Sequence, residues 1–194
     1  MNGLYINTSA DLFIKMYPII DLLGDDVKSY NWLVSEVGPW DAVFVKYSIK
    51  SDRYENETYH FISGDELRKA LYDNRMQVMN YATLSAFDKD INIEQILEGG
   101  IPKADFNDDL WTNPVRMQNE RSVIEIIAVD GTKLQIKSQD DKILDRYADA
   151  YPNAVDLARY NEGVMRKTGN KGGNSQADKA EGKGGFFSRL FGNR

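Results

Sequence analysis

The sequence contains no cysteine and only one histidine, His60, among its 194 residues. Without cysteine the chain cannot form a disulfide framework, a thiolate nucleophile, a CxxC redox pair or a cysteine-ligated zinc or iron–sulfur centre. A single histidine also excludes a metal site with two histidine ligands. A chain of this length can fold through its core alone. Its 42% hydrophobic and 28% charged residues are typical of a globular protein.

Long apolar runs are also lacking. The N-terminal region has no basic start, and the apolar stretch from Leu12 to Leu23 is interrupted by Lys15, Pro18 and Asp21, so it does not resemble a signal peptide. No run approaches the roughly 18 apolar residues that a transmembrane helix needs. We therefore expect a cytoplasmic protein.

Positive charge is scarce in the first 165 residues. They contain 17 basic and 28 acidic residues, a net charge of −11, whereas residues 166–194 contain seven basic and two acidic residues, a net charge of +5. A negative body repels the phosphates of nucleic acids and attracts a basic partner. We expect no nucleic acid ligand and a basic protein partner; the alternative is that the charge only keeps the protein soluble.

Local patterns predict an α+β domain over residues 1–167. Two β-rich runs within residues 121–138 flank Asp130 and Gly131, a pair that favours a type I′ hairpin turn. Ser63 and Glu66 form a capping box that predicts the start of a helix. The irregular alternation of strands and helices favours a mostly antiparallel sheet with packed helices over a doubly wound parallel sheet.

The remaining elements follow from periodicity and turn residues. A second capping box, at Ser138 and Asp141, predicts a helix that ends at Pro152. The other predictions are strands over 30–36, 42–49 and 58–62, an extended segment over 76–87, and helices over 12–23, 92–98 and 154–165.

The composition changes near Thr168. Residues 168–185 contain nothing larger and more apolar than alanine, which predicts a flexible Gly-rich linker. Apolar residues return in 186–194, where the spacing predicts a short amphipathic helix with Arg189 toward its polar side. Its apolar side is formed by Phe186, Phe187, Leu190 and Phe191. We interpret this basic and aromatic hook as a tether to a protein groove or, reversibly, to anionic lipid; folding back onto the body is the third alternative.

No catalytic motif accompanies His60. On an alternating strand its side chain faces away from Tyr59 and Phe61, and no GxSxG elbow is present, so a structural or solvent-facing role is favoured over catalysis. The chain also lacks GxxxxGK[ST] and GxGxxG phosphate loops. We predict no catalytic residue, no cofactor and no metal ligand.

Adjacent carboxylates occur in three places: Asp25 and Asp26, Asp108 and Asp109, and Asp140 and Asp141. The side chains of such neighbours diverge, which makes them poor acid–base couples, although a carboxylate-only magnesium site stays open.

The aromatic residues suggest where a partner binds. Trp40 and Trp111 stand near strand ends and loops, where an indole ring can be half exposed and anchor an interface. Trp111 lies in the loop sequence ADFNDDLWTNP, close to Asp108 and Asp109. We predict that these four residues contact the partner; packing of the tryptophans in the core is the alternative.

The order of YNWLVSEV, YHFISGDELRKAL and VIEIIAVDGTKLQIKS, followed by DDKILDRYADAY, resembles that of small bacterial single-domain proteins of uncharacterised function. It is also similar in style to immunity proteins of polymorphic toxin systems. The resemblance covers residues 1–150 and implies a non-catalytic acidic α+β domain that binds a cognate toxin. The basic tail departs from that pattern.

Three functional hypotheses follow. The first is a non-enzymatic immunity-type inhibitor that captures a basic toxin. The second is an adaptor or accessory protein that its C-terminal FFSRLF segment recruits to a larger assembly or to the periphery of the inner membrane. The third is an enzyme that works with carboxylates, hydroxyls and lysines.

Overall fold

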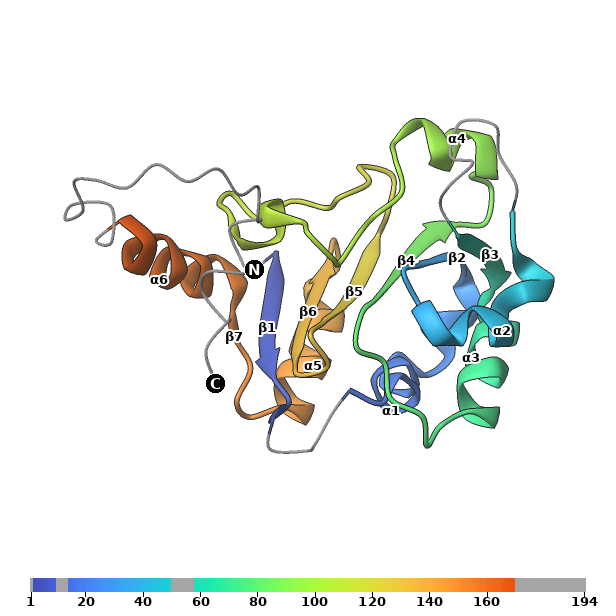
Figure 1. The fold of residues 1–194 in the computed structure, drawn as a ribbon, viewed down its shortest axis with the longest axis horizontal. Coiled ribbons are helices and arrows are strands. Elements are labelled where there is room, and N and C mark those ends of the chain that lie inside the picture. The colour runs from blue at the N-terminus through green and yellow to red at the C-terminus, as the bar shows by residue number, and fades with distance from the viewer. Residues whose placement is uncertain (1, 10–13, 50–57, 170–194) are drawn as a thin grey trace, which may run out of the picture.

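The computed structural model describes residues 2–9, 14–49 and 58–169 (Figure 1). The hook over 186–194 lies outside the described residues, and so does the linker apart from Thr168 and Gly169. Those two residues belong to the last helix, α6 (Leu157–Gly169).

The described residues form one seven-stranded sheet in the order β3-β2-β4-β5-β6-β1-β7 (Figure 1). All neighbouring strands are antiparallel, which confirms the predicted fold class. The strands are β1 (Gly3–Asn7), β2 (Tyr30–Ser35), β3 (Tyr59–Ser63), β4 (Ala82–Asp88), β5 (Ile124–Val129), β6 (Lys133–Ser138) and β7 (Val155–Asp156).

Helices connect the strands. The α-helices besides α6 are α1 (Met16–Asp21), α2 (Asp41–Phe44), α3 (Gly64–Asp73), α4 (Ile93–Glu98) and α5 (Asp141–Ala150). Short 3₁₀ helices are η2 (Gly24–Ser29), η3 (Gly38–Trp40), η4 (Val45–Tyr47) and η6 (Asp108–Trp111). Within the described ranges no helix is long and apolar enough to cross a bilayer.

The elements with local signals form as predicted. Asp130 and Gly131 have φ angles of 56° and 63°, which suit a type I′ turn between β5 and β6. Ser63 caps α3, since its hydroxyl accepts a hydrogen bond from the Glu66 N–H. Helix α4 starts in a full capping box between Asn92 and Gln95. Each signal satisfies a backbone group at an element end and needs no distant contact.

Four predicted elements are wrong in type or extent. One is the helix over 154–165, which begins only at Leu157 because residues 155 and 156 form the strand β7. Of the strand predicted over 42–49, the residues up to Tyr47 form α2 and η4 instead, an arrangement that buries Phe44 completely, while Ser48 forms a single antiparallel bridge with His60. Among the described residues of the helix predicted over 12–23, α1 covers Met16–Asp21, with Pro18 in its first turn, where a missing N–H is harmless. The extended segment over 76–87 becomes a strand only at Ala82.

The second capping box also differs from the prediction. Helix α5 is capped by Asp140, whose carboxylate accepts from the Lys142 N–H at 2.9 Å. The Ser138 hydroxyl instead accepts from the Asp140 N–H at 3.0 Å, so it orients the cap rather than forming it.

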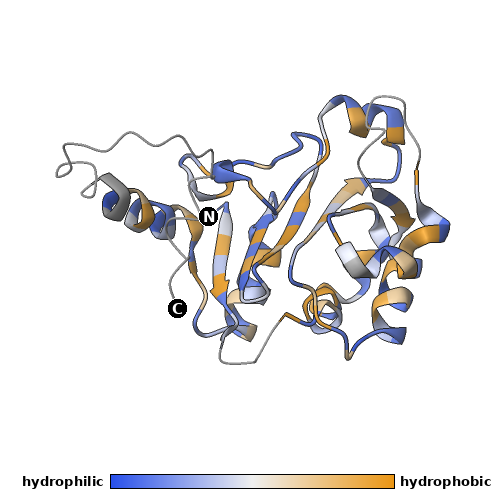
Figure 2. Ribbon diagram, in the orientation of Figure 1, coloured by the Kyte–Doolittle hydropathy of each residue, from blue (hydrophilic) through white to orange (hydrophobic). Residues whose placement is uncertain are grey.

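The two faces of the sheet are covered differently. Along β6 residues alternate between apolar and polar (Figure 2), whereas in β5 Glu125 is the one polar residue. The apolar residues, such as Ile126 and Ile136, pack with α1, α3 and α5 in the largest hydrophobic cluster. Their neighbours Glu125 and Lys137 point to the other face, beneath residues 99–123. We call residues 99–123 the crossing loop.

Candidate functional site

The crossing loop joins α4 to β5 and is tied to the sheet by side chains. The hydroxyl of Ser35 donates to the Pro102 carbonyl at 2.6 Å, and the Gln135 amide donates to the Leu110 carbonyl at 2.9 Å. Buried carbonyl groups need such donors when no strand ladder supplies them. The polar side chains of this sheet face therefore donate to loop carbonyl groups that, in a helix or strand, would be bonded to other backbone groups.

Glu125 and Lys137 form the charged centre of this face. They are opposite each other on β5 and β6, their side chains are 0% and 4% exposed, and the ammonium lies 3.4 Å from the carboxylate. The other carboxylate oxygen of Glu125 accepts from the N–H groups of Gln118 (2.8 Å) and Asn119 (3.1 Å) and from the Ser122 hydroxyl (3.0 Å). A buried carboxylate with this many donors holds the end of the crossing loop against β5.

Lys137 also reaches the crossing loop. Its ammonium donates to the Arg116 carbonyl at 2.8 Å. Burial lowers the pKa of Lys137 below its usual value, and attraction to Glu125 offsets part of that shift. Removal from water therefore influences the pKa of this ammonium more than its ion pair does.

A strained residue positions the outer part of the loop. Glu36 has a φ of 56°, in the left-handed region that residues other than glycine rarely adopt. Its carboxylate accepts from the N–H groups of Ala104 and Asp105. Burial raises the pKa of Glu36, and these two hydrogen bonds partly oppose the shift. The next loop residue, Phe106, also has a positive φ, 49°, and its side chain is 86% exposed.

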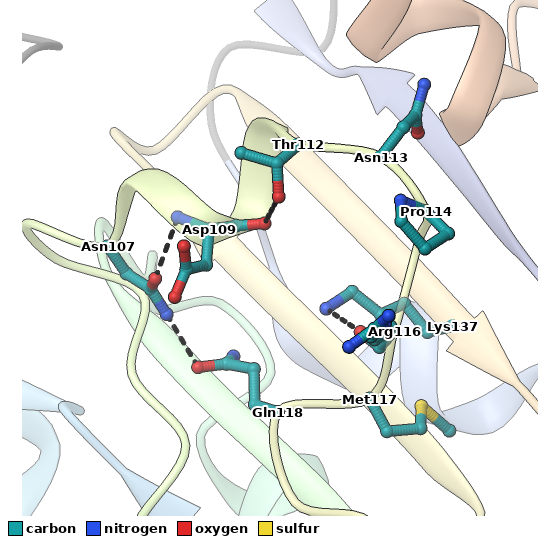
Figure 3. A pocket seen from close by; sticks show the side chains of 9 residues that line it. All are labelled: Asn107, Asp109, Thr112, Asn113, Pro114, Arg116, Met117, Gln118 and Lys137. Atoms are coloured by element: carbon teal, nitrogen blue, oxygen red, sulfur yellow. Dashed lines mark hydrogen bonds between the residues drawn. The ribbon is translucent and has the colours of Figure 1, made fainter.

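A cavity of about 490 Å³ opens beneath the loop (Figure 3). Its polar lining comes from the loop and from β6, and includes Asn107, Asp109, Thr112, Arg116, Gln118 and Lys137. The cavity is therefore polar and has charges of both signs on its wall.

Neither predicted tryptophan is a surface anchor. Trp40 is 4% exposed, and its indole N–H donates to the Val78 carbonyl at 3.0 Å. Trp111 is 3% exposed and packs edge-on against Tyr5, with ring centroids 6.2 Å apart. The expectation of half-exposed rings is wrong for both, because each indole removes more apolar area from water by packing inward.

The two predicted aspartates are exposed but separate in role. Both begin η6, where carboxylates are favourable near a helix N-terminus. Asp109 lines the cavity (Figure 3), whereas Asp108 does not. Both aspartates follow closely after Phe106 in the chain. The sequence analysis did not select Phe106 as a contact residue, although its side chain is exposed. The signal was present: Phe106 is the aromatic residue among the acidic and turn-forming residues of ADFNDD.

His60 is fully buried, on the sheet side opposite to Tyr59 and Phe61, as predicted. One ring nitrogen lies 3.0 Å from the Ser48 hydroxyl and the other 3.3 Å from the Asp41 carboxylate. The same three residue types form hydrolytic triads, but there the orienting carboxylate is buried, whereas the Asp41 side chain is 45% exposed. The contacts satisfy both nitrogens of an enclosed imidazole.

Among the residues that the structure describes, no group of three or more histidine, aspartate and glutamate side chains is placed to hold a metal ion. None of the three pairs of adjacent aspartates belongs to such a group in this part of the chain.

Comparison with protein-family models, with curated proteins and with solved structures finds no match for this chain.

Proposed function

We propose that this protein is a non-enzymatic protein-binding domain whose crossing loop contacts a basic partner. The observation that carries the proposal is Phe106, an aromatic side chain that is 86% exposed between Asp105, whose N–H donates to Glu36, and Asn107, whose amide donates to the Lys103 carbonyl. An exposed aromatic ring on a rigid support loses little entropy when a partner covers it. Burying such a ring contributes about 2 kcal/mol.

Charge supports a basic partner. Asp105 and Asp108 flank Phe106, and residues 1–165 contain 17 basic and 28 acidic residues, a net charge of −11. A field of this sign speeds the approach of a positively charged protein and slows that of an acidic one. An aromatic anchor with an acidic rim suits the capture of a basic toxin, so we favour an immunity-type inhibitor acting in the cytoplasm.

The test starts from the tagged full-length protein, captured gently from its native cells to identify a stoichiometric partner. Association and dissociation rates are then measured with the purified pair. We expect Phe106→Ser to raise the dissociation rate at least about tenfold. Asp105→Asn with Asp108→Asn should lower the association rate at low salt and have little effect at high salt.

Met76→Ser is the matched control, because Met76 is 73% exposed on the segment after α3, away from the crossing loop. Its rates should equal those of the wild type. The proposal fails if no stoichiometric partner is captured, or if Phe106→Ser and Met76→Ser have the same rates.

The adaptor hypothesis is the second candidate, because the four apolar residues in 186–191 are spaced for one helix side. The hook lies outside the described residues, and its deletion separates the two proposals. A partner retained after deletion of residues 186–194 supports binding through the body. A partner or a lipid-dependent sedimentation that is lost with the hook supports recruitment instead.

A further inference from the structure

The cavity beneath the crossing loop has opposite charges on opposite sides. In Figure 3 the Asp109 carboxylate lies across the hollow from Arg116 and Lys137. Within the described ranges, neither the Asp109 carboxylate nor the Arg116 guanidinium has an ion-pair partner. The two charges face the same space without neutralising each other.

The cavity also has hydrogen-bond donors left over. The Gln118 amide oxygen is held by the Lys103 N–H at 2.8 Å and by the Asn107 amide at 2.7 Å. These contacts fix which way the amide faces, and its NH₂ group is then buried without a partner among the described residues. A buried donor of this kind is destabilising unless something accepts from it.

Lys137 provides a further donor. An ammonium has three N–H groups. The described contacts of this one are the Arg116 carbonyl at 2.8 Å and the Glu125 carboxylate at the longer distance of 3.4 Å. Because the side chain also lines the cavity, its third N–H is available to a ligand oxygen.

The balance of charge narrows the ligand class. Glu125 pairs with Lys137 below the cavity, while Asp109 and Arg116 stand on opposite sides of it as unpaired charges of opposite sign among the described residues. A simple anion would be repelled by Asp109, and a simple cation by Arg116. A molecule with one carboxylate and one ammonium can satisfy both sides at once. The volume of about 490 Å³ is in the range of small-molecule pockets, and Pro114 and Met117 provide apolar contact for a side chain.

We propose that this cavity is a binding site for a small zwitterion of the free α-amino acid class. The ligand carboxylate accepts from Arg116, Lys137 and the Gln118 amide, while its ammonium donates to Asp109. The site is separate from the partner contact at Phe106, which does not line the cavity.

The test uses the purified full-length protein and the common L-amino acids, each offered singly at millimolar concentration, with binding followed by calorimetry. We expect at least one of them to bind. Its analogue without the amino group and its analogue without the carboxylate should each bind at least about tenfold more weakly.

Variants assign the site. Arg116→Gln and Asp109→Asn should each weaken binding of the best amino acid by about tenfold or more, and both positions are exposed enough to leave the fold intact. Arg121→Gln is the matched control, since Arg121 is an exposed arginine of the same loop that pairs with Glu98 and does not line the cavity. It should bind like the wild type.

The proposal is overturned if no amino acid of the set binds. It is equally overturned if the analogue without the amino group binds as well as the amino acid, or if Arg116→Gln and Asp109→Asn bind like the wild type. Phe106→Ser should keep amino acid binding while losing partner affinity, so failure here is distinguishable from failure of the proposed function.

Discussion

One face of the sheet is covered by helices, and the centre of the other is covered by a loop with little regular structure. Ile126 and Glu125 are neighbours on β5, yet one packs among aliphatic side chains and the other accepts hydrogen bonds from the loop backbone. Helices bring their own hydrogen bonds and need only apolar contact from the sheet. A loop brings unpaired backbone groups, so the sheet must supply polar partners.

This difference affects how each face tolerates change. Aliphatic packing is non-directional, so a small loss of volume costs in proportion to the area lost. The contacts of Glu125 are directional and linked, so removing one group leaves several others unsatisfied. The polar face is therefore both the more fragile face and the one that can position a functional loop.

The largest effect should come from breaking the centre of the polar face. Glu125→Leu keeps the approximate volume but removes the acceptor of two N–H groups, one hydroxyl and the Lys137 ammonium. We expect a loss of about 4 kcal/mol in the free energy of unfolding. Ile126→Val, on the other face, should lose about 1 kcal/mol. Denaturant unfolding would contradict the comparison if the two losses were equal.

Lys137→Met should have a smaller effect of about 2 kcal/mol at neutral pH, because the ammonium already carries a desolvation cost. The pKa of Lys137 is lowered in the folded state, so between that value and the unfolded value of about 10.4 the unfolded chain holds more protons. The stability of the wild type relative to Lys137→Met should therefore rise with pH in that window and be lost as pH falls through the folded pKa. A difference in unfolding free energy between the wild type and Lys137→Met that stays the same at all pH values would refute this prediction.

Ser35→Ala tests one tie between sheet and loop. The hydroxyl donates to the Pro102 carbonyl at 2.6 Å in a buried setting, and its loss should cost about 1 kcal/mol. Amide hydrogen exchange should accelerate in the crossing loop and stay unchanged in α3 and α5, which cover the other face. Uniform acceleration over the whole domain would show that the loop is not a separate unit.

Phe106→Ser should have the smallest effect on stability, within about 0.5 kcal/mol of the wild type, since the side chain is 86% exposed. A thermal or denaturant unfolding experiment measures it. A loss as large as that of Ser35→Ala would mean that Phe106 contributes to the fold, and its exposure would no longer mark a contact surface.

Elements with local signals were predictable. The Asp130–Gly131 turn and the Ser63 cap depend on residues within a few positions of each other, so sequence reasoning placed them correctly. Residues 42–49 have strand-like composition, but those up to Tyr47 are helical and bury Phe44 completely. The preference of single residues for strand or helix is a small free energy, and the free energy gained by burying a large side chain outweighs it.

The candidate site was only partly predictable. Asp108 and Asp109 were identified from charge and turn composition, whereas Trp111 in the same loop turned inward to Tyr5. Glu125 and Lys137 alternate with aliphatic residues, a pattern that places them on a solvent-facing side. Whether such a face is covered by water or by a loop depends on segments that are distant in the sequence. The periodicity of a strand carries no information about those segments.

The amino-acid sequence by itself determined the chemistry that is excluded by the lack of cysteine, the charge of the body, the central hairpin and the Ser63 helix cap, because each depends on composition or on neighbouring residues. Only the tertiary structure decided that the crossing loop covers Glu125 and Lys137, that Phe106 stays outside, and that Asp109 and Arg116 face one cavity. These features depend on contacts between distant segments, whose energies exist only once the sheet has formed.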